Sequence, residues 1–269
     1  MAIPKIIHYC WFGKGEMSKT DKDCLDSWRK VLPDYQIKRW DESNFDVNCC
    51  EYAKEAYKAK KWAYVSDCAR YRILEKEGGF FLDTDVKVLK SYNPLLKEQC
   101  FFGVERPNYS IAPGLVIGAV QGHHVIKEMV DIYAHTKFLN PAEVPNAPTS
   151  PDYITELLKN YGFVQENRLQ QLKEVTIYPY EYFAPMDSVT GLTNISKETY
   201  SVHLYNTSWE TDDVRLWHER RYKLNRRFGV KAGRYIYLIW SLPSRIKKRI
   251  EDDGIQKTFG YALKKIVRK

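Results

Sequence analysis

Apolar and polar positions follow two different periods near the start of the chain. Residues 5–12 form a short apolar run that ends at Gly13, which is typical of a buried strand followed by a turn. A capping box at residues 18–21 precedes apolar residues at helical spacing, and Pro33 stops that run. Residues 35–40 then alternate with the period of two that a strand requires. The pattern predicts a strand, a helix and a second strand.

The same rhythm continues around a longer helix. Apolar residues at helical spacing run through 62–77, and Gly78-Gly79 supplies the left-handed conformation in which helices commonly end. Residues 80–82 predict a buried strand directly afterwards, and 86–89 predict another. Because strands and helices alternate, we expect an α/β domain up to about residue 213. The other predicted elements are a short helix at 52–57, strands at 101–104, 115–119, 175–178 and 200–204, and helices at 125–138 and 153–161.

Charge is distributed unevenly along the chain. The whole sequence has 269 residues and a formal net charge of +8. Residues 215–269 hold 17 Lys and Arg against 4 Asp and Glu, so this segment carries +13 and residues 1–214 carry −5. We therefore expect a mildly acidic domain over 1–213 and a basic, mainly helical extension over 214–269. Aromatic and aliphatic residues at 235–240 lie among the cations, a composition that favours an anionic membrane surface.

From the same sequence we expect neither a membrane-spanning helix nor a secretory signal peptide. No apolar run is long enough to span a bilayer, and the first residues lack the basic and apolar regions of a signal peptide. The cysteines show no C-x-x-C spacing, which favours reduced thiols in the core over disulfides or a zinc site. We expect a cytoplasmic protein, peripheral on the inner face of the cell membrane. The six cysteines are at positions 10, 24, 49, 50, 68 and 100.

Two carboxylates stand at the end of one predicted strand. Asp83-Thr84-Asp85 follows three apolar residues, and ligand sites of α/β proteins lie at the carboxyl ends of strands. Carboxylate oxygens suit Mg²⁺ or Mn²⁺ shared with a diphosphate. Taken alone, the motif also fits a solvated turn that caps a helix.

The surroundings of these acids resemble a known family. The pattern S-D-x-x-R-x-x-x-L, followed by G-G-x-[YF]-x-D-x-D, resembles glycosyltransferase family 32, to which capsule, lipopolysaccharide and yeast mannosyl transferases belong. The catalytic domains of the large clostridial glucosylating toxins share it. The opening strand and a closing H-x-x-x-x-S-W segment are also similar, and the likeness is good over residues 1–120. It rests on residues 3–13, 66–74, 78–85 and 201–209.

That resemblance implies a GT-A fold, a nucleotide diphosphate sugar donor and a divalent metal, Mn²⁺ or Mg²⁺. It implies that Asp83, Asp85 and His203 ligate the metal. The catalytic residues it implies are Asp67, Arg70, Asp83 and Asp85. The donor-binding residues it implies are Trp11, Ser66, Asp67, Arg70, Asp83, Asn206, Ser208 and Trp209. Asn206, Ser208 and Trp209 are placed on a lid that closes over the donor.

Each of these assignments has a plainer alternative. Asp67 and Arg70 are one helical turn apart, so they could form only a surface ion pair. Trp11 could pack in the core instead of stacking on the nucleotide base, and His203 could be an ordinary strand histidine. Phe81 departs from the family, in which many members have Tyr, so any contact of that hydroxyl is missing.

The resemblance further implies transfer with retention of anomeric configuration, for which no side-chain base is required; Glu105 is a candidate acceptor-side carboxylate. We expect sugar transfer, with a UDP-sugar favoured over a GDP-sugar, to a saccharide in capsule, exopolysaccharide or lipopolysaccharide assembly. The acceptor could be lipid-linked, with 215–269 on an anionic membrane. The alternatives are a metal-dependent phosphotransferase or nuclease, and a nucleic-acid-binding module formed by the basic extension. No nucleic-acid motif accompanies that extension, so we expect no such partner.

Overall fold

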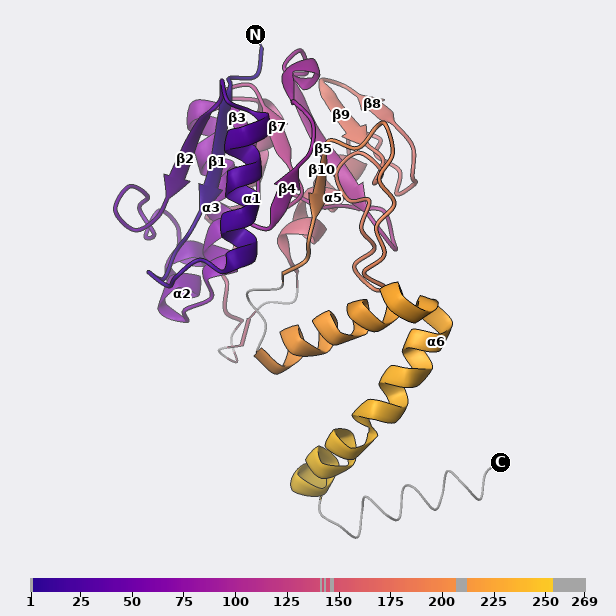
Figure 1. Ribbon diagram of the computed structural model, residues 1–269. Helices are drawn as coiled ribbons and strands as arrows, with labels where there is room; N and C mark the ends of the chain where they lie inside the picture. The colour runs from indigo at the N-terminus through magenta and orange to yellow at the C-terminus, as the bar shows by residue number, and fades with distance from the viewer. Residues whose placement is uncertain (1, 141, 143, 146–147, 207–211, 254–269) are drawn as a thin grey trace. The chain divides into compact units, whose positions relative to one another are not determined.

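The computed structural model describes residues 2–140, 142, 144–145, 148–206 and 212–253 of the chain (Figure 1). The chain divides into two compact units. The first comprises Met1–Ser188 and Thr193–Trp209, and the second comprises Val189–Leu192 and Glu210–Lys269. A short segment of the acidic part of the sequence therefore packs with the basic extension. A domain boundary between residues 213 and 214 stays a prediction.

A mixed sheet forms the centre of the first unit, with the strand order β2-β1-β3-β7-β5-β9-β8 and with β6 paired to β5. β1 pairs in parallel with β2 and β3, whereas β7 is antiparallel to both β3 and β5. The α/β class is confirmed, and the predicted alternation of strand and helix describes its first half. The strands are β1 (Ile6–Cys10), β2 (Gln36–Trp40), β3 (Gly79–Phe81), β5 (Cys100–Glu105), β6 (Ser110–Ile111), β7 (Ile117–Ala119), β8 (Gln170–Leu172) and β9 (Val175–Tyr178).

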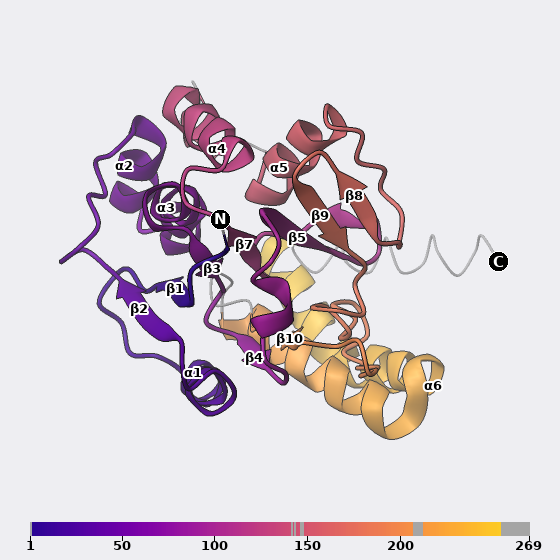
Figure 2. The same ribbon diagram turned by 90° about the horizontal axis from the view of Figure 1, so that it is seen from above.

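Helices cover both faces of this sheet. Seen from above, α1 lies on one face, and α2, α3, α4 and α5 lie on the other (Figure 2). α1 begins where the sequence predicts, because Ser18 and Asp21 form a reciprocal capping box. α3 has the predicted bounds and ends at Gly78, whose φ is 64°. The helices are α1 (Lys19–Val31), α2 (Glu51–Lys58), α3 (Trp62–Glu77), α4 (His124–His135) and α5 (Ser150–Lys159).

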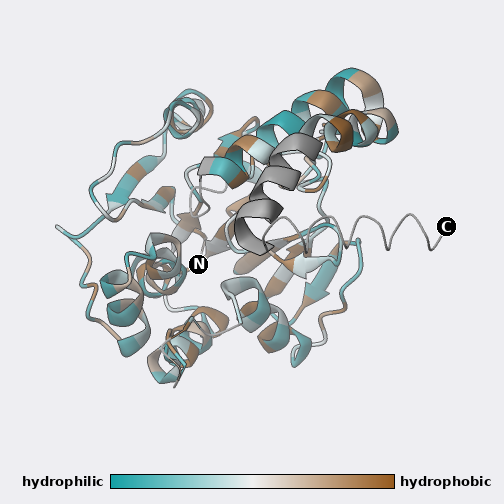
Figure 3. Ribbon diagram, turned by 90° about the horizontal axis from the view of Figure 1, so that it is seen from below, coloured by the Kyte–Doolittle hydropathy of each residue, from teal (hydrophilic) through white to brown (hydrophobic). Residues whose placement is uncertain are grey.

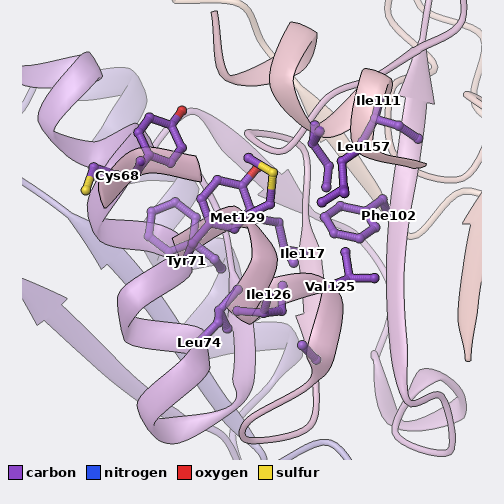
Figure 4. Close-up of a cluster of buried hydrophobic side chains, with 14 of the residues drawn as sticks. Cys68, Tyr71, Leu74, Phe102, Ile111, Ile117, Val125, Ile126, Met129 and Leu157 are labelled. Carbon is purple, nitrogen blue, oxygen red and sulfur yellow. The ribbon is translucent and has the colours of Figure 1, made fainter. Parts of the chain in front are cut away.

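The two faces have separate hydrophobic cores because neighbouring strand residues point in opposite directions. Phe80 and Phe101 pack with α1, whereas Phe81 and Phe102 pack with α3, α4 and α5. Figure 4 shows part of the second core. All four phenylalanines are fully buried. The strand that precedes the acidic motif is therefore held from both sides.

A small second sheet brings the closing segment of the unit to the acidic motif. β4 (Val86–Val88) follows Asp85 directly, and β10 (Ser201–His203) pairs with it in antiparallel register. His203 lies opposite Val86 in this pairing. Residues more than a hundred positions apart along the chain are therefore neighbours at the end of β3. A 3₁₀ turn, η1 (Asn93–Leu95), follows β4.

The second unit is mainly helical, as predicted. α6 (Asp212–Asp253) is interrupted at Gly229, whose φ of 78° and ψ of 161° are not helical. The two helical parts contact each other, since the rings of Trp217 and Tyr237 lie 5.7 Å apart and the Arg220 guanidinium lies 4.7 Å from the Trp240 ring centre. Polar and apolar stretches alternate along α6 (Figure 3). Within the described residues, no helix combines the length and the apolar character needed to cross a bilayer.

Candidate functional site

The acidic motif lies in a loop that the sheet holds at both sides. The backbone N–H of Leu82 donates to the carbonyl oxygen of His8, and that of Asp83 donates to the carbonyl oxygen of Gly114, each at 3.1 Å. A side chain at Gly114 would clash with Asp83, because a Cβ placed there would lie 2.2 Å from Asp83 Oδ2. A side chain at position 114 would therefore force the Asp83 carboxylate to move, a constraint that the sequence pattern did not reveal.

Asp67, Arg70 and Asp83 form one ionic group around the buried guanidinium of Arg70. Arg70 Nη2 lies 2.9 Å from Asp67 Oδ1 and 3.2 Å from Asp83 Oδ1, and its side chain is 5% exposed. The guanidinium lies 5.0 Å from the ring centre of Phe81, the residue that departs from the family pattern. Burial raises the pKa of Asp67 to about 6, with Asp83 adding to the effect and Arg70 opposing it. The pair is therefore not an exposed surface ion pair.

Asp85 and His203 form a second buried pair. His203 Nε2 lies 3.0 Å from Asp85 Oδ1, and the backbone N–H of Asn206 donates to Asp85 Oδ2 at 2.8 Å. Burial alone would raise the pKa of Asp85, but the charge and hydrogen bond of His203 and the Asn206 N–H together hold it below its usual value. Burial would lower the pKa of His203, but Asp85, Asp83 and Glu105 raise it to about 9. At neutral pH the pair is ionic.

The motif is also tied to the start of α1. Thr84 Oγ1 donates to Asp21 Oδ1 at 3.0 Å, and the Asn206 side-chain amide donates to Ser18 Oγ at 3.3 Å. The capping box of α1 thus connects the motif to the closing segment. This arrangement places Asn206, a predicted donor-binding residue, beside Asp85. Ser208 and Trp209, predicted on the same segment, lie outside the described residues.

A carboxylate and a tyrosine complete the group. Tyr205 Oη donates to Glu105 Oε2 at 3.0 Å, and the rings of Tyr205 and His203 lie 4.3 Å apart. Tyr205 has a φ of 51°, a left-handed conformation that non-glycine residues seldom adopt away from functional sites. Burial raises the pKa of Glu105, with Asp83 adding to the effect. In the sequence, Glu105 was indicated only by its place after a predicted strand. No sequence signal of its own pointed to Tyr205.

The charges of this group fit a divalent cation. Among the described residues, the four carboxylates of Asp67, Asp83, Asp85 and Glu105 interact with two cationic side chains, those of Arg70 and His203. His203 Nδ1 is buried and has no hydrogen-bond partner among the described residues. Carboxylate and imidazole ligands suit Mn²⁺ or Mg²⁺. The site therefore has the donor set and the excess negative charge that such an ion requires.

The three predicted ligands do not stand together as a closed metal cage. Two trios of described ligand-type side chains have their ligand atoms within 4.8 Å of one another, and neither contains Asp83, Asp85 or His203. The chain instead holds Asp83 with Arg70 and Asp85 with His203. The trios are Cys49, Cys50 and Cys68, and His123, His124 and Glu174.

Trp11 and Ser66 lie beside this arrangement through β1 and α3. Trp11 is half-buried directly after β1, and its indole N–H donates to the carbonyl oxygen of Gly15 at 2.7 Å. Ser66 opens the turn of α3 that carries Asp67 and Arg70, and its carbonyl oxygen accepts from Arg70 Nε at 3.4 Å. Trp11 retains an accessible surface, as a residue that stacks on a base must.

Replacing Gly114 by alanine should lower activity without unfolding the chain. The new Cβ must push the Asp83 carboxylate away from its contact with Arg70, because the 2.2 Å separation cannot persist. We expect the turnover rate to fall at least about tenfold, as displacements of about 1 Å do in active sites. Gly15→Ala is the control, since nothing lies within 4 Å of a Cβ there. Equal rates for both variants in a donor hydrolysis assay would contradict the predicted clash.

Comparison with known proteins places the acidic motif in a family. Residues 18–102 match the glycosyltransferase sugar-binding region containing a DXD motif. The inositol phosphoceramide mannosyltransferase 3 of Schizosaccharomyces pombe is 32% identical over 136 residues, which are 48% of this chain and 36% of that protein. The chain thus spans about a third of that relative's length. An uncharacterized glycosyltransferase, L373, of Acanthamoeba polyphaga mimivirus is 29% identical over 59% of this chain and 67% of its own.

Two solved glycosyltransferase structures are more distant. A glycosyltransferase involved in glycosylation of the major capsid of PBCV-1 is 13% identical, with a TM-score of 0.46 over 80% of this chain and 99% of that one. The galactosyltransferase LgtC, solved with donor and acceptor sugar analogues, is 14% identical, with a TM-score of 0.42 over 81% and 94%.

The predicted resemblance to glycosyltransferase family 32 is confirmed by the sequence match, which includes Asp67, Arg70, Asp83 and Asp85. Residues 18–102 of the chain are thus similar to the sugar-binding region of glycosyltransferases that contain a DXD motif.

Proposed function

We propose that the chain is a metal-dependent glycosyltransferase that moves a sugar from a nucleotide diphosphate to a saccharide acceptor with retention of anomeric configuration. The observation that carries this proposal is the joining of Asp67, Arg70 and Asp83 into one buried group inside the matched region. A buried cluster with surplus negative charge is costly unless a ligand compensates it. A divalent cation supplies that compensation, and the bound cation can in turn hold the anionic diphosphate of the donor.

Asp67 and Arg70 are the proposed donor-sugar contacts. The carboxylate of Asp67 accepts hydrogen bonds from sugar hydroxyls, and the guanidinium of Arg70 offers donors in a fixed fork. Arg70 is held rigidly because two carboxylates contact it and the Phe81 ring lies against it. Such prior fixation lowers the entropy lost when the donor is positioned.

Asp83, Asp85 and His203 are the residues that would hold Mn²⁺ or Mg²⁺. When bound, the ion neutralises the charge that develops on the leaving diphosphate. Asn206 lies beside Asp85, and its side chain would contact the diphosphate when the closing segment covers the donor. Ser208 and Trp209 are proposed to act with it.

Glu105 and Tyr205 form the proposed acceptor side. Their hydrogen bond orients the carboxylate next to His203, and burial raises the pKa of Glu105, which makes the carboxylate a stronger proton acceptor. A front-side reaction does not require this base, since a diphosphate oxygen can take the acceptor proton. Because Glu105 would assist the acceptor and not the donor, Glu105→Gln should lower transfer without abolishing it and without changing donor binding.

A panel of nucleotide sugars with Mn²⁺ tests the proposal without knowledge of the acceptor. We expect slow release of nucleoside diphosphate from one donor, with UDP-sugars favoured, and loss of that release when the ion is chelated. Proton NMR of the first sugar released or transferred reports the anomeric configuration. No release from any UDP- or GDP-sugar, or release that is unaffected by chelation, would contradict the proposal.

Trp11→Ala should weaken nucleotide binding. Stacking of a base on an aromatic side chain contributes about 1–3 kcal/mol, so the dissociation constant of the nucleoside diphosphate should rise by about 5- to 150-fold in calorimetric titration. Trp217→Ala, in the other unit, is the control and should bind nucleotide like the unaltered chain. An unchanged affinity with a large fall in melting temperature would assign Trp11 to the core.

We further propose that the second unit binds an anionic membrane that carries a lipid-linked acceptor. Tyr235, Ile239 and Trp240 are 69%, 74% and 55% exposed, on a helix in a segment of net charge +13. Exposed aromatic and aliphatic residues among cations are typical of interfacial helices. The name of the yeast relative describes transfer to a sphingolipid, which supports a lipid acceptor here. Capsule, exopolysaccharide or lipopolysaccharide assembly would provide one.

A variant that combines Tyr235→Ser, Ile239→Ser and Trp240→Ser should no longer sediment with anionic vesicles. The aromatic contacts supply the part of the affinity that salt does not screen, while the cations supply the rest. Ile195→Ser with Leu169→Ser, which are 59% and 49% exposed in the first unit, is the matched control. An RNA gel shift at physiological salt, with no preference for anionic vesicles, would instead favour the nucleic-acid alternative.

A further inference from the structure

Three of the six cysteines converge at one place. Cys49 and Cys50 stand directly before α2, with Cys50 as its N-cap, and Cys68 lies in the middle of α3. Their sulfur atoms lie within 4.8 Å of one another, and the Sγ atoms of Cys50 and Cys68 are 3.4 Å apart. No sequence spacing announces this cluster, because it forms only when α2 packs on α3.

The spacing of the three sulfurs matches that of a thiolate metal site. Zinc binds thiolates at about 2.3 Å in a tetrahedral arrangement, which sets neighbouring sulfurs about 3.8 Å apart. Small side-chain rotations would bring these three to that separation. We propose that Cys49, Cys50 and Cys68 form a three-thiolate site for a soft divalent ion such as Zn²⁺, separate from the carboxylate site.

Arg72 supplies the charge that such a site needs. It lies one turn after Cys68 on α3, and the three thiols act on it electrostatically. Arg72 Nε is buried without a hydrogen-bond partner, and no carboxylate of the described residues forms an ion pair with it. Three thiolates around Zn²⁺ carry one net negative charge, so the Arg72 guanidinium would neutralise the complex.

Two of the three thiols are partly accessible to solvent. Cys49 and Cys50 are half-buried, whereas Cys68 is buried. Binding releases the protons of the three thiols to solvent, and a water molecule can take the fourth position.

The bound ion would fix the segment before α2 to the helix that carries Asp67 and Arg70. Soft thiolate ligands select Zn²⁺ or Cd²⁺, whereas the carboxylate site selects Mn²⁺ or Mg²⁺. The chain would therefore hold two metals of different chemistry, one for structure and one for the donor.

Titration of the full, reduced chain with Cd²⁺ tests this proposal, because thiolate-to-cadmium charge transfer absorbs in the ultraviolet and a carboxylate site gives no such band. We expect one equivalent to bind, the band to disappear in Cys50→Ser and Cys68→Ser, and competition by Zn²⁺. Cys49→Ser should weaken binding at least about tenfold. Cys24→Ala and Asp83→Asn are the controls, and each should keep the full band.

Several results would overturn the proposal. They are the lack of a thiolate band at one equivalent of Cd²⁺, the same band in Cys50→Ser as in the unaltered chain, and its loss in Asp83→Asn. Melting curves of each variant show whether it is folded. If the purified chain instead contains a disulfide between Cys50 and Cys68 and, once reduced, takes up no metal, the cluster is a redox pair and the metal site is refuted.

Discussion

Asp85→Asn should lower sugar transfer by at least about a hundredfold, the range seen when one group that stabilises developing charge is removed. Asparagine has nearly the same shape, but it removes the negative charge that faces the proposed cation and the partner of His203. Donor hydrolysis in saturating Mn²⁺, measured at several ion concentrations, reports this change. Asp83→Asn should have a similar or smaller effect, because Arg70 already neutralises part of that charge.

The matched control is Asp23→Asn, which removes a charge from the exposed face of α1, where Asp23 contacts Lys19. It should transfer sugar at the normal rate. The pKa of Asp85 is lowered by folding, so its ionised form stabilises the fold above the unfolded value near 4. The free energy of unfolding of Asp85→Asn should therefore be about 1–3 kcal/mol lower at pH 7. The transfer rates must be corrected for the folded fraction. Normal rates for both Asp83→Asn and Asp85→Asn would refute the metal site.

Local patterns predicted the first half of the fold well, because the signals there are strong and close together. The capping box at Ser18 and the glycine after Glu77 fix the ends of α1 and α3 to within a residue. The pairing of β3 with β7 was beyond such reasoning, since nothing in either strand specifies an antiparallel partner almost forty residues away. The two-residue β6 and the break of α6 at Gly229 also lack a periodic signal.

The candidate site likewise has a part that the sequence could predict and a part that it could not. Asp67, Arg70, Asp83 and Asp85 could be found because they stand within one short stretch of sequence that a family shares. The contacts of this stretch with Gly114 and with His203 could not be predicted, because they depend on strand pairings that join distant segments. The burial of Arg70 was also hidden, since helical spacing gives the same pattern for an exposed ion pair.

Arg70→Ala should destabilise the fold by about 3–5 kcal/mol at neutral pH, because it leaves two carboxylates without their buried cation. Arg29→Ala is the matched control. Arg29 contacts Asp26 at 2.7 Å, also three residues apart on a helix, but both side chains are more than half exposed. That variant should change stability by no more than about 1 kcal/mol. Urea unfolding of both variants separates a buried ionic group from an ordinary surface pair.

The loss caused by Arg70→Ala should also depend on pH. The pKa of Asp67 is about 6 in the folded chain and near 4 when unfolded, so the folded state binds the proton more tightly. Asp67 therefore weakens the fold as pH rises from about 4 through about 6. Removing Arg70 raises that folded pKa further, since the opposing cation is gone. The loss in free energy of unfolding caused by Arg70→Ala should then be smaller at pH 5 than at pH 7.5. Adding Asp67→Asn to the Arg70→Ala variant should remove most of this dependence on pH. A loss that is equal at both pH values would show that packing on Phe81, rather than charge, is the main contribution of Arg70 to stability.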